Sequence, residues 1–232
     1  MNAAHRWITD AIHPFEYDVA SLVPPVFEGY ARVFHPAHQV HLPETHYAVS
    51  WKAVAEANNR IAHPAMEWGS LVGSWDLPRQ LGLWDDPPDT GRLPVPTTEQ
   101  LSRVLKQYSR TDTVMYALWN GYGGTEIANA EIIELPQRPM YVITGSIDDA
   151  TEPFGIPGRT ANSWWASDRQ WYVATDIDLM TTYVGASAQC IRAILDSDAL
   201  EAMPVRSDQR VTWDADTINP LPDSPGARSR GR

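Results

Sequence analysis

Five stretches of the chain carry the apolar pattern of a helix with one buried face. They are residues 3–12, 51–58, 64–72, 97–108 and 187–196. The clearest is the fourth, where Leu101, Leu105 and Tyr108 recur at the spacing of one helical face. Thr97 and Gln100 have the spacing of a capping box. We therefore expect this helix to begin at Thr97.

Strand patterns dominate the second half of the chain. Residues 27–35 alternate in polarity, and residues 113–119 form a nearly continuous apolar run, which is typical of a strand buried on both faces. Further strands are predicted at residues 131–135, 140–145, 170–179 and 210–214. Because helices come first and strands follow with short links, we predict an α+β fold, with a mostly antiparallel sheet of four to five strands and flanking helices.

We expect one α+β domain over residues 1–220. The length of 232 residues is enough to bury a sizeable core. Residues 73–96 are rich in proline, aspartate and glycine, and they predict a long irregular excursion. Residues 221–232 hold one large apolar residue beside three arginines, so we predict a disordered tail there.

The balance of charge narrows the classes of partner. Lys and Arg number 18 and Asp and Glu number 29, which gives a formal net charge of −11. Such a chain repels phosphate backbones and anionic headgroups, so we expect no nucleic-acid partner and no membrane partner. The expected partner is a protein, with a basic protein as the favoured case, or a small-molecule ligand.

Cysteine usage and the absence of targeting patterns indicate the compartment. Cys190 is the only cysteine, which excludes an internal disulfide and a Cys-rich zinc site. No apolar run approaches the ~18 residues of a membrane span, and no secretory signal pattern opens the chain. We therefore expect a soluble cytoplasmic protein. The glycines after residue 120 lack the Lys-Ser/Thr of a phosphate-binding loop, and no cofactor is expected.

Tryptophan is unusually abundant, with 10 copies, and residues 163–171 place three of them beside an Asp–Arg pair. Arg169 could stack on an indole or clamp a carboxylate. The predicted binding residues are Trp165, Asp168, Arg169, Tyr172, Asp176 and Asp178. We expect Arg169 to border the same cleft as Asp176 or Asp178. The alternative is a Trp-rich strand with a structural ion pair.

Asp176 and Asp178 form the main candidate for catalytic chemistry. They lie two residues apart in one predicted strand, so both point to the same face, while Trp171, Val173 and Ile177 are expected to be buried together on the other. Paired carboxylates could bind a divalent ion or act as acid and base. A solvated sheet face or a turn at the strand end is the alternative.

All seven histidines lie in the first 63 residues. His35, His38 and His41, with the nearby Glu44, are candidate ligands for zinc or nickel. Their spacing is not that of a helical pair, and prolines interrupt the segment. Exposed loop histidines without a metal are therefore the alternative.

Several motifs resemble a family of uncharacterised bacterial proteins. They are Ser-Leu-Val-Pro-Pro at residues 21–25, Ala-Leu-Trp-Asn-Gly-Tyr-Gly at 117–123, and Trp-Trp-Ala-Ser-Asp-Arg-Gln-Trp-Tyr-Val-Ala-Thr-Asp-Ile-Asp-Leu at 164–179. The resemblance covers most of residues 20–215 and carries no known function. The chain is also similar, in general class and not in any motif, to immunity-type α+β proteins, which neutralise toxins. Those proteins are likewise small, acidic and Trp-rich.

Together these patterns favour a soluble binding or interaction protein with a Trp-rich, acidic surface. The alternative is a hydrolase or metal-dependent enzyme that uses Asp176 and Asp178 with His35 or His38. An enzyme is expected to bring Asp178, Arg169 and a histidine into one pocket. A binding protein is expected instead to expose an apolar patch rimmed with acid.

Overall fold

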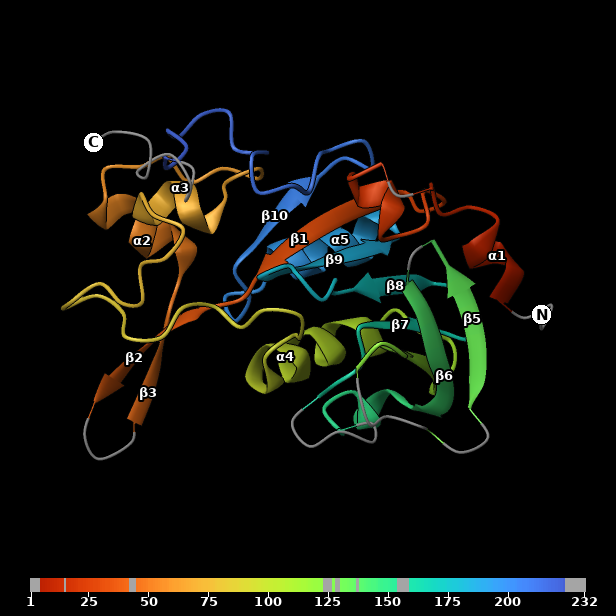
Figure 1. Cartoon of the computed structure of the whole chain (residues 1–232). Coiled ribbons are helices and arrows are strands. Elements are labelled where there is room, and N and C mark those ends of the chain that lie inside the picture. The colour runs from red at the N-terminus through yellow and green to blue at the C-terminus, as the bar shows by residue number, and fades with distance from the viewer. Residues whose placement is uncertain are drawn as a thin grey trace.

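One antiparallel sheet of eight strands organises the fold, in the order β10-β1-β9-β8-β7-β4-β6-β5 (Figure 1). Its strands are β1 Gly29–Phe34, β4 Thr113–Trp119, β5 Glu131–Leu135, β6 Arg138–Ser146, β7 Ser163–Ala166, β8 Trp171–Ala174, β9 Thr181–Ala186 and β10 Ala202–Val205. A separate two-stranded hairpin pairs β2 (Ala37–His41) with β3 (Thr45–Val49). The predicted α+β class is confirmed, and four to five strands was an undercount.

The structure is a computed structural model, and it describes most of the chain. The described residues are 5–14, 16–41, 45–122, 127, 130–136, 138–153 and 159–223. Residues 224–232 of the predicted tail, Glu44 of the candidate metal segment and the glycines at 123 and 124 lie outside them.

The undercount of strands has a physical reason. Strands β7 and β9 are short and buried on both faces, so neither shows the alternation that marks a half-buried strand. The prediction of a strand at 210–214 was wrong, because this segment makes only an isolated bridge, between Asp18 and Arg210. The edge strand β10 lies earlier in the chain and contains Pro204, which an edge position tolerates.

The helices are α1 Arg6–Thr9, α2 Trp51–Ala57, α3 Trp68–Val72, α4 Val95–Lys106 and α5 Ala188–Leu195, with short 3-10 turns at Val19–Ser21 and Ile147–Asp149. Ser50 and Ser187 cap α2 and α5 through their side chains. The predicted capping box at Thr97 was wrong, because α4 begins two residues earlier, after Pro94. There the Thr98 hydroxyl donates to the Pro94 carbonyl at 3.1 Å.

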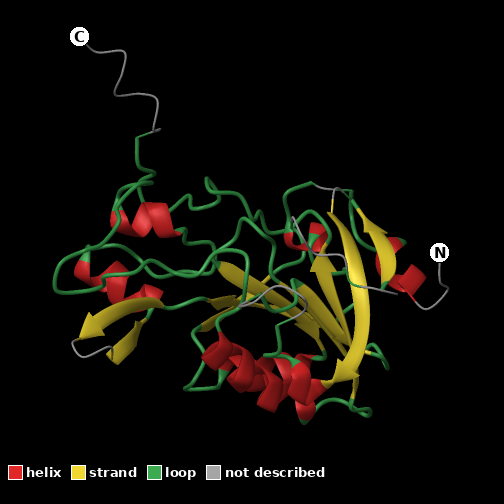
Figure 2. Ribbon diagram, turned by 60° about the horizontal axis from the view of Figure 1, so that its bottom comes forward, coloured by secondary structure: helices red, strands yellow, loops and turns green. Residues whose placement is uncertain are grey.

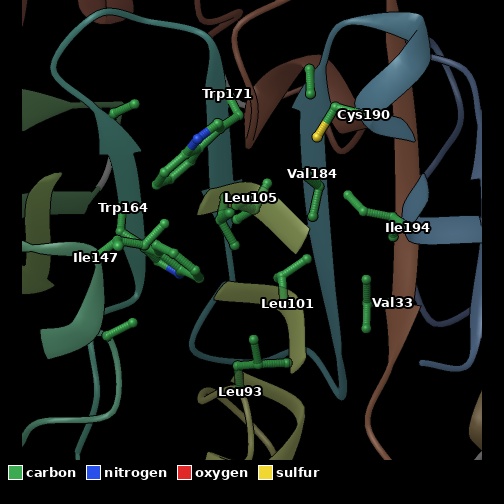
Figure 3. Packing of buried hydrophobic residues seen from close by; sticks show 14 of the residues in the cluster. Val33, Leu93, Leu101, Leu105, Ile147, Trp164, Trp171, Val184, Cys190 and Ile194 are labelled. Carbon is green, nitrogen blue, oxygen red and sulfur yellow. The ribbon is translucent and has the colours of Figure 1, made fainter. Parts of the chain in front are cut away.

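Both faces of the large sheet are covered. Helices α4 and α5 pack on one face, where Leu101, Leu105 and Ile194 meet Trp164 and Trp171 (Figures 2 and 3). The N-terminal segment covers the other face with an apolar cluster of its own. A third cluster fills the α2–α3 lobe, which we define as residues 50–91, at the side of the sheet (Figure 1).

Strand β8 lies in the middle of the sheet and is buried on both faces. Trp171 and Val173 are both fully buried in the same cluster, as the strand pattern predicted. Ile177 does not join them, because β8 ends at Ala174 and the chain then turns. The indole Nε1 of Trp171 donates to the Ser109 hydroxyl at 2.7 Å, which fixes the ring against the end of α4.

We predict that Trp171→Ala lowers the free energy of unfolding by about 3–5 kcal/mol, because it removes one of the largest side chains of a packed core. Leu81→Ala is the control, since Leu81 is 79% exposed and its loss is expected to cost less than about 0.5 kcal/mol. Chemical denaturation followed by far-UV circular dichroism measures both. A loss below about 1 kcal/mol in Trp171→Ala would contradict this packing.

Candidate functional site

The structure places Trp165 and Tyr172 in the core and not on a binding surface. Both side chains are about 1% exposed or less, and their rings stack with centroids 5.4 Å apart. They pair across β7 and β8 and pack against the N-terminal segment. The expectation that they form a recognition surface was wrong, because central strands of a sheet covered on both faces leave aromatic residues no access to solvent.

Asp168 and Arg169 close the turn between β7 and β8. The Asp168 carboxylate accepts backbone hydrogen bonds from Arg110 at 2.9 Å and from Gln170 at 3.2 Å. Arg169 has a positive φ of 62°, and its guanidinium carbon lies 5.6 Å from the ring centroid of Trp7. This pair therefore shapes a turn, in which Asp168 acts through backbone hydrogen bonds and not through the structural ion pair of the alternative interpretation.

Asp176 and Asp178 lie in the turn after β8, at the strand end opposite to Arg169. The expected shared cleft between Arg169 and these aspartates is therefore wrong. Their true cationic partner is Arg138, at the start of β6. Its Nε lies 3.2 Å from Asp176, and its Nη2 lies 3.3 Å from Asp178.

His35 is a buried structural residue and does not act as a metal ligand. Its Nδ1 lies 2.6 Å from the Asp89 carbonyl oxygen, and its Nε2 lies 2.9 Å from the Thr182 hydroxyl. A carbonyl can only accept, so Nδ1 carries the proton and Nε2 accepts from Thr182. Burial lowers the pKa of His35 to about 4, although its contact with Asp89 opposes the shift.

Within the described part of the chain, His35, His38 and His41 are not brought together as metal ligands. His38 and His41 lie on the β2–β3 hairpin, where the ring of His38 contacts that of His46 and the ring of His41 contacts that of Tyr47. Among the residues that the structure describes, the possible ligand atoms of His13, Glu16 and Asp18 lie close enough together to hold a metal ion. That group is largely exposed, and its Asp18 already caps a 3-10 turn.

A cavity of about 810 Å³ lies beside the α2–α3 lobe. One wall comes from the lobe, at residues 51, 67–69 and 74–75. The opposite wall comes from the sheet and its connections, at residues 32, 138, 176 and 178–181. Residues 210–214 close a third side. The cavity therefore joins segments that are far apart in the sequence.

Four tryptophans line this cavity: Trp51, Trp68, Trp75 and Trp213. The rings of Trp75 and Trp213 meet at 90° with centroids 5.3 Å apart, so they form a corner. Trp213 is 59% exposed and Trp75 is partly buried. Trp75 packs directly on Gly69 of α3, where a Cβ would lie 2.3 Å from its ring. Gly69 is therefore required for this position of the indole.

A buried ion pair forms the inner wall. Arg32 on β1 donates to the Glu67 carboxylate at 2.8 Å, at the start of α3. The guanidinium also donates to the Met66 carbonyl at 2.9 Å and to the Thr181 hydroxyl at 3.3 Å. Burial raises the pKa of Glu67, and the ion pair with Arg32 opposes that rise. Both charges are thus compensated within the wall.

The rim carries further charged residues. Arg138 holds Asp176 and Asp178 on one side, and Arg210 pairs with Asp214 at 3.3 Å on the other. The hydrogen bond from Thr212 lowers the pKa of Asp214, with a smaller contribution from Arg210. The rim therefore presents carboxylates around an aromatic corner at neutral pH.

Of the predicted binding residues, the cavity includes Asp176 and Asp178 and excludes Trp165, Asp168, Arg169 and Tyr172. Trp75, Trp213 and Arg138 are the site residues that sequence reasoning missed. For Trp75 an available signal was its location in the segment rich in proline, aspartate and glycine. Trp213 gave no such signal, because it fell within a predicted strand.

Comparisons with known proteins do not identify the chain. No family model, no curated protein and no solved structure matches it. The resemblance to a bacterial family therefore stays a prediction. In the described part of the chain, no helix has the length and apolar character needed to cross a membrane.

We predict that His35 makes stability depend on pH. The pKa falls from its ordinary 6.5 in the unfolded chain to about 4 in the fold, so the unfolded state binds a proton first as pH drops. The resulting stability is present above pH 6.5 and declines as pH falls towards 4, by about 3 kcal/mol.

Denaturation at pH 7 and pH 4 of the wild type and His35→Gln measures this effect. The difference in unfolding free energy between the two proteins is expected to shrink as pH falls, since the variant has lost the titrating group. His41→Gln is the control, because His41 is exposed on the hairpin. Parallel pH profiles for the wild type and His35→Gln would contradict the assignment of a buried neutral imidazole.

Proposed function

We propose that this chain is a binding protein and that the aromatic cavity is its recognition site. The observation that carries the proposal is the exposed corner of Trp75 and Trp213 at the mouth of a cavity of about 810 Å³. A volume of that order accommodates a small ligand or an inserted side chain. Exposed tryptophans beside compensated charges are typical of residues that dominate binding energy.

The chemistry of the lining residues supports binding over catalysis. Among the residues that the structure describes, no histidine and no cysteine lines the cavity. Asp176 and Asp178 are both engaged by one guanidinium group, that of Arg138. Cys190 lies in the core, where burial raises the pKa of its thiol to about 12. It is therefore poorly suited to act as a nucleophile.

The distribution of exposed apolar area also supports binding. Tyr17 and Trp213 are both more than half exposed, and both line the cavity. Asp178 and Asp214 lie beside them. This combination supports a binding role, since an apolar surface rimmed with acid was the expectation for a binding protein, although it lies away from the Trp-rich strands.

The test uses the full-length protein, immobilised and exposed to a native lysate of its source cells. A partner that the wild type retains is identified by mass spectrometry, and its dissociation constant is then measured for the wild type and for Trp213→Ala. We predict a loss of about tenfold or more in Trp213→Ala, because truncating a binding hot spot costs more than about 1.4 kcal/mol.

Tyr47→Ala is the matched control, since Tyr47 is 54% exposed on the hairpin and does not line the cavity. Its affinity is expected to stay within about twofold of the wild type. If Trp213→Ala binds the partner as well as the wild type does, or if Tyr47→Ala loses it equally, the cavity is not the recognition site.

A further inference from the structure

We infer that the cavity receives a cationic side chain, arginine or lysine, from a basic segment of a partner protein. The inference rests on the proposed function and adds the chemistry of the ligand. It follows from two independent features of the cavity: the geometry of its indoles and the state of its charges.

The geometry of the indoles suits an organic cation. Trp75 and Trp213 stand at 90° with centroids 5.3 Å apart, so they form a corner, in which Trp213 is 59% exposed. The faces of indole rings carry negative electrostatic potential and attract ammonium and guanidinium groups, and tryptophan does so most strongly. Perpendicular walls let one cation contact more than one ring.

The balance of charge favours a cation over an anion. The lining holds four carboxylates and three guanidinium groups, so it has an excess of negative charge. The guanidinium groups are engaged: Arg32 with Glu67, Arg138 with Asp176 and Asp178, and Arg210 with Asp214. An anion would have to displace these partners.

The carboxylate of Asp178, in contrast, remains open to a ligand. The side chain of Asp178 is 75% exposed, whereas that of Arg138, its partner, is 19% exposed. Oxygen atoms of Asp178 therefore face solvent at the rim while the cation that holds them lies behind. The net charge of −11 adds a long-range attraction for a basic segment.

The test titrates the full-length protein with a blocked Gly-Arg-Gly tripeptide and follows the indole N–H signals by two-dimensional NMR. The signal of Trp213 is assigned by its loss in Trp213→Phe. We expect the Arg peptide to shift the Trp213 signal with saturation below about 10 mM. A Gly-Lys-Gly peptide is expected to do the same. Citrulline in place of arginine, which keeps the shape and removes the charge, is expected to bind at least about tenfold more weakly.

Two protein variants locate the effect. Asp178→Asn is expected to weaken binding of the Arg peptide about fivefold or more, because it removes a rim carboxylate. Asp148→Asn is the matched control: its side chain is also 75% exposed and also forms an ion pair, with Lys106, but it lies outside this cavity. Its affinity is expected to remain unchanged, and circular dichroism verifies that both variants fold.

Three results would overturn the inference. They are equal binding of the citrulline peptide, equal losses in Asp178→Asn and Asp148→Asn, and no shift of the Trp213 signal by either cationic peptide. None of them bears on the lysate experiment, in which loss of the partner in Trp213→Ala would still support a recognition site of different ligand chemistry.

Discussion

The buried guanidinium group of Arg32 connects the large sheet to the α2–α3 lobe. It projects from β1 and is almost completely removed from solvent, with hydrogen bonds to the carbonyls of Pro64 and Met66 and an ion pair with Glu67. The rings of Phe34 and other aromatic residues surround it. Burying a charge is costly, so its position is tolerable only because these acceptors are already in place. The α2–α3 lobe is therefore held in one orientation relative to the sheet.

That orientation creates the cavity. Its lobe wall follows α3 through Gly69 to Trp75, and its sheet wall carries Arg32 itself. The C-terminal segment is attached to the lobe by a second polar network, in which His63 contacts Asp216 at 2.9 Å and Asn219 donates to the Ile61 carbonyl at 2.9 Å. This network holds the segment that places Trp213 against Trp75 of the lobe. The candidate site thus depends on two sets of buried polar contacts, and the apolar clusters alone would not define it.

The tryptophans divide into two physical roles. Those of the β7–β8 hairpin lie in the packed core of the sheet, where they contribute apolar area and are inaccessible to a partner. Trp75 and Trp213 lie on irregular segments at the cavity mouth, where one face of an indole can stay open. Abundance of tryptophan is therefore a poor guide to the site, whereas a tryptophan outside regular structure, beside charged residues, is a better one.

The sequence by itself determined the elements whose signals are local. Apolar periodicity and a serine cap were sufficient for α2, and the uninterrupted apolar run was sufficient for β4, because both depend on neighbours in the chain. Tertiary structure alone decided the short strands β7 and β9, whose burial comes from helices on both faces. It also decided that Arg138, and not Arg169, pairs with Asp176, since 38 residues separate that pair along the chain. Such contacts form when distant strands meet in one sheet, and no local pattern records which strands will be neighbours.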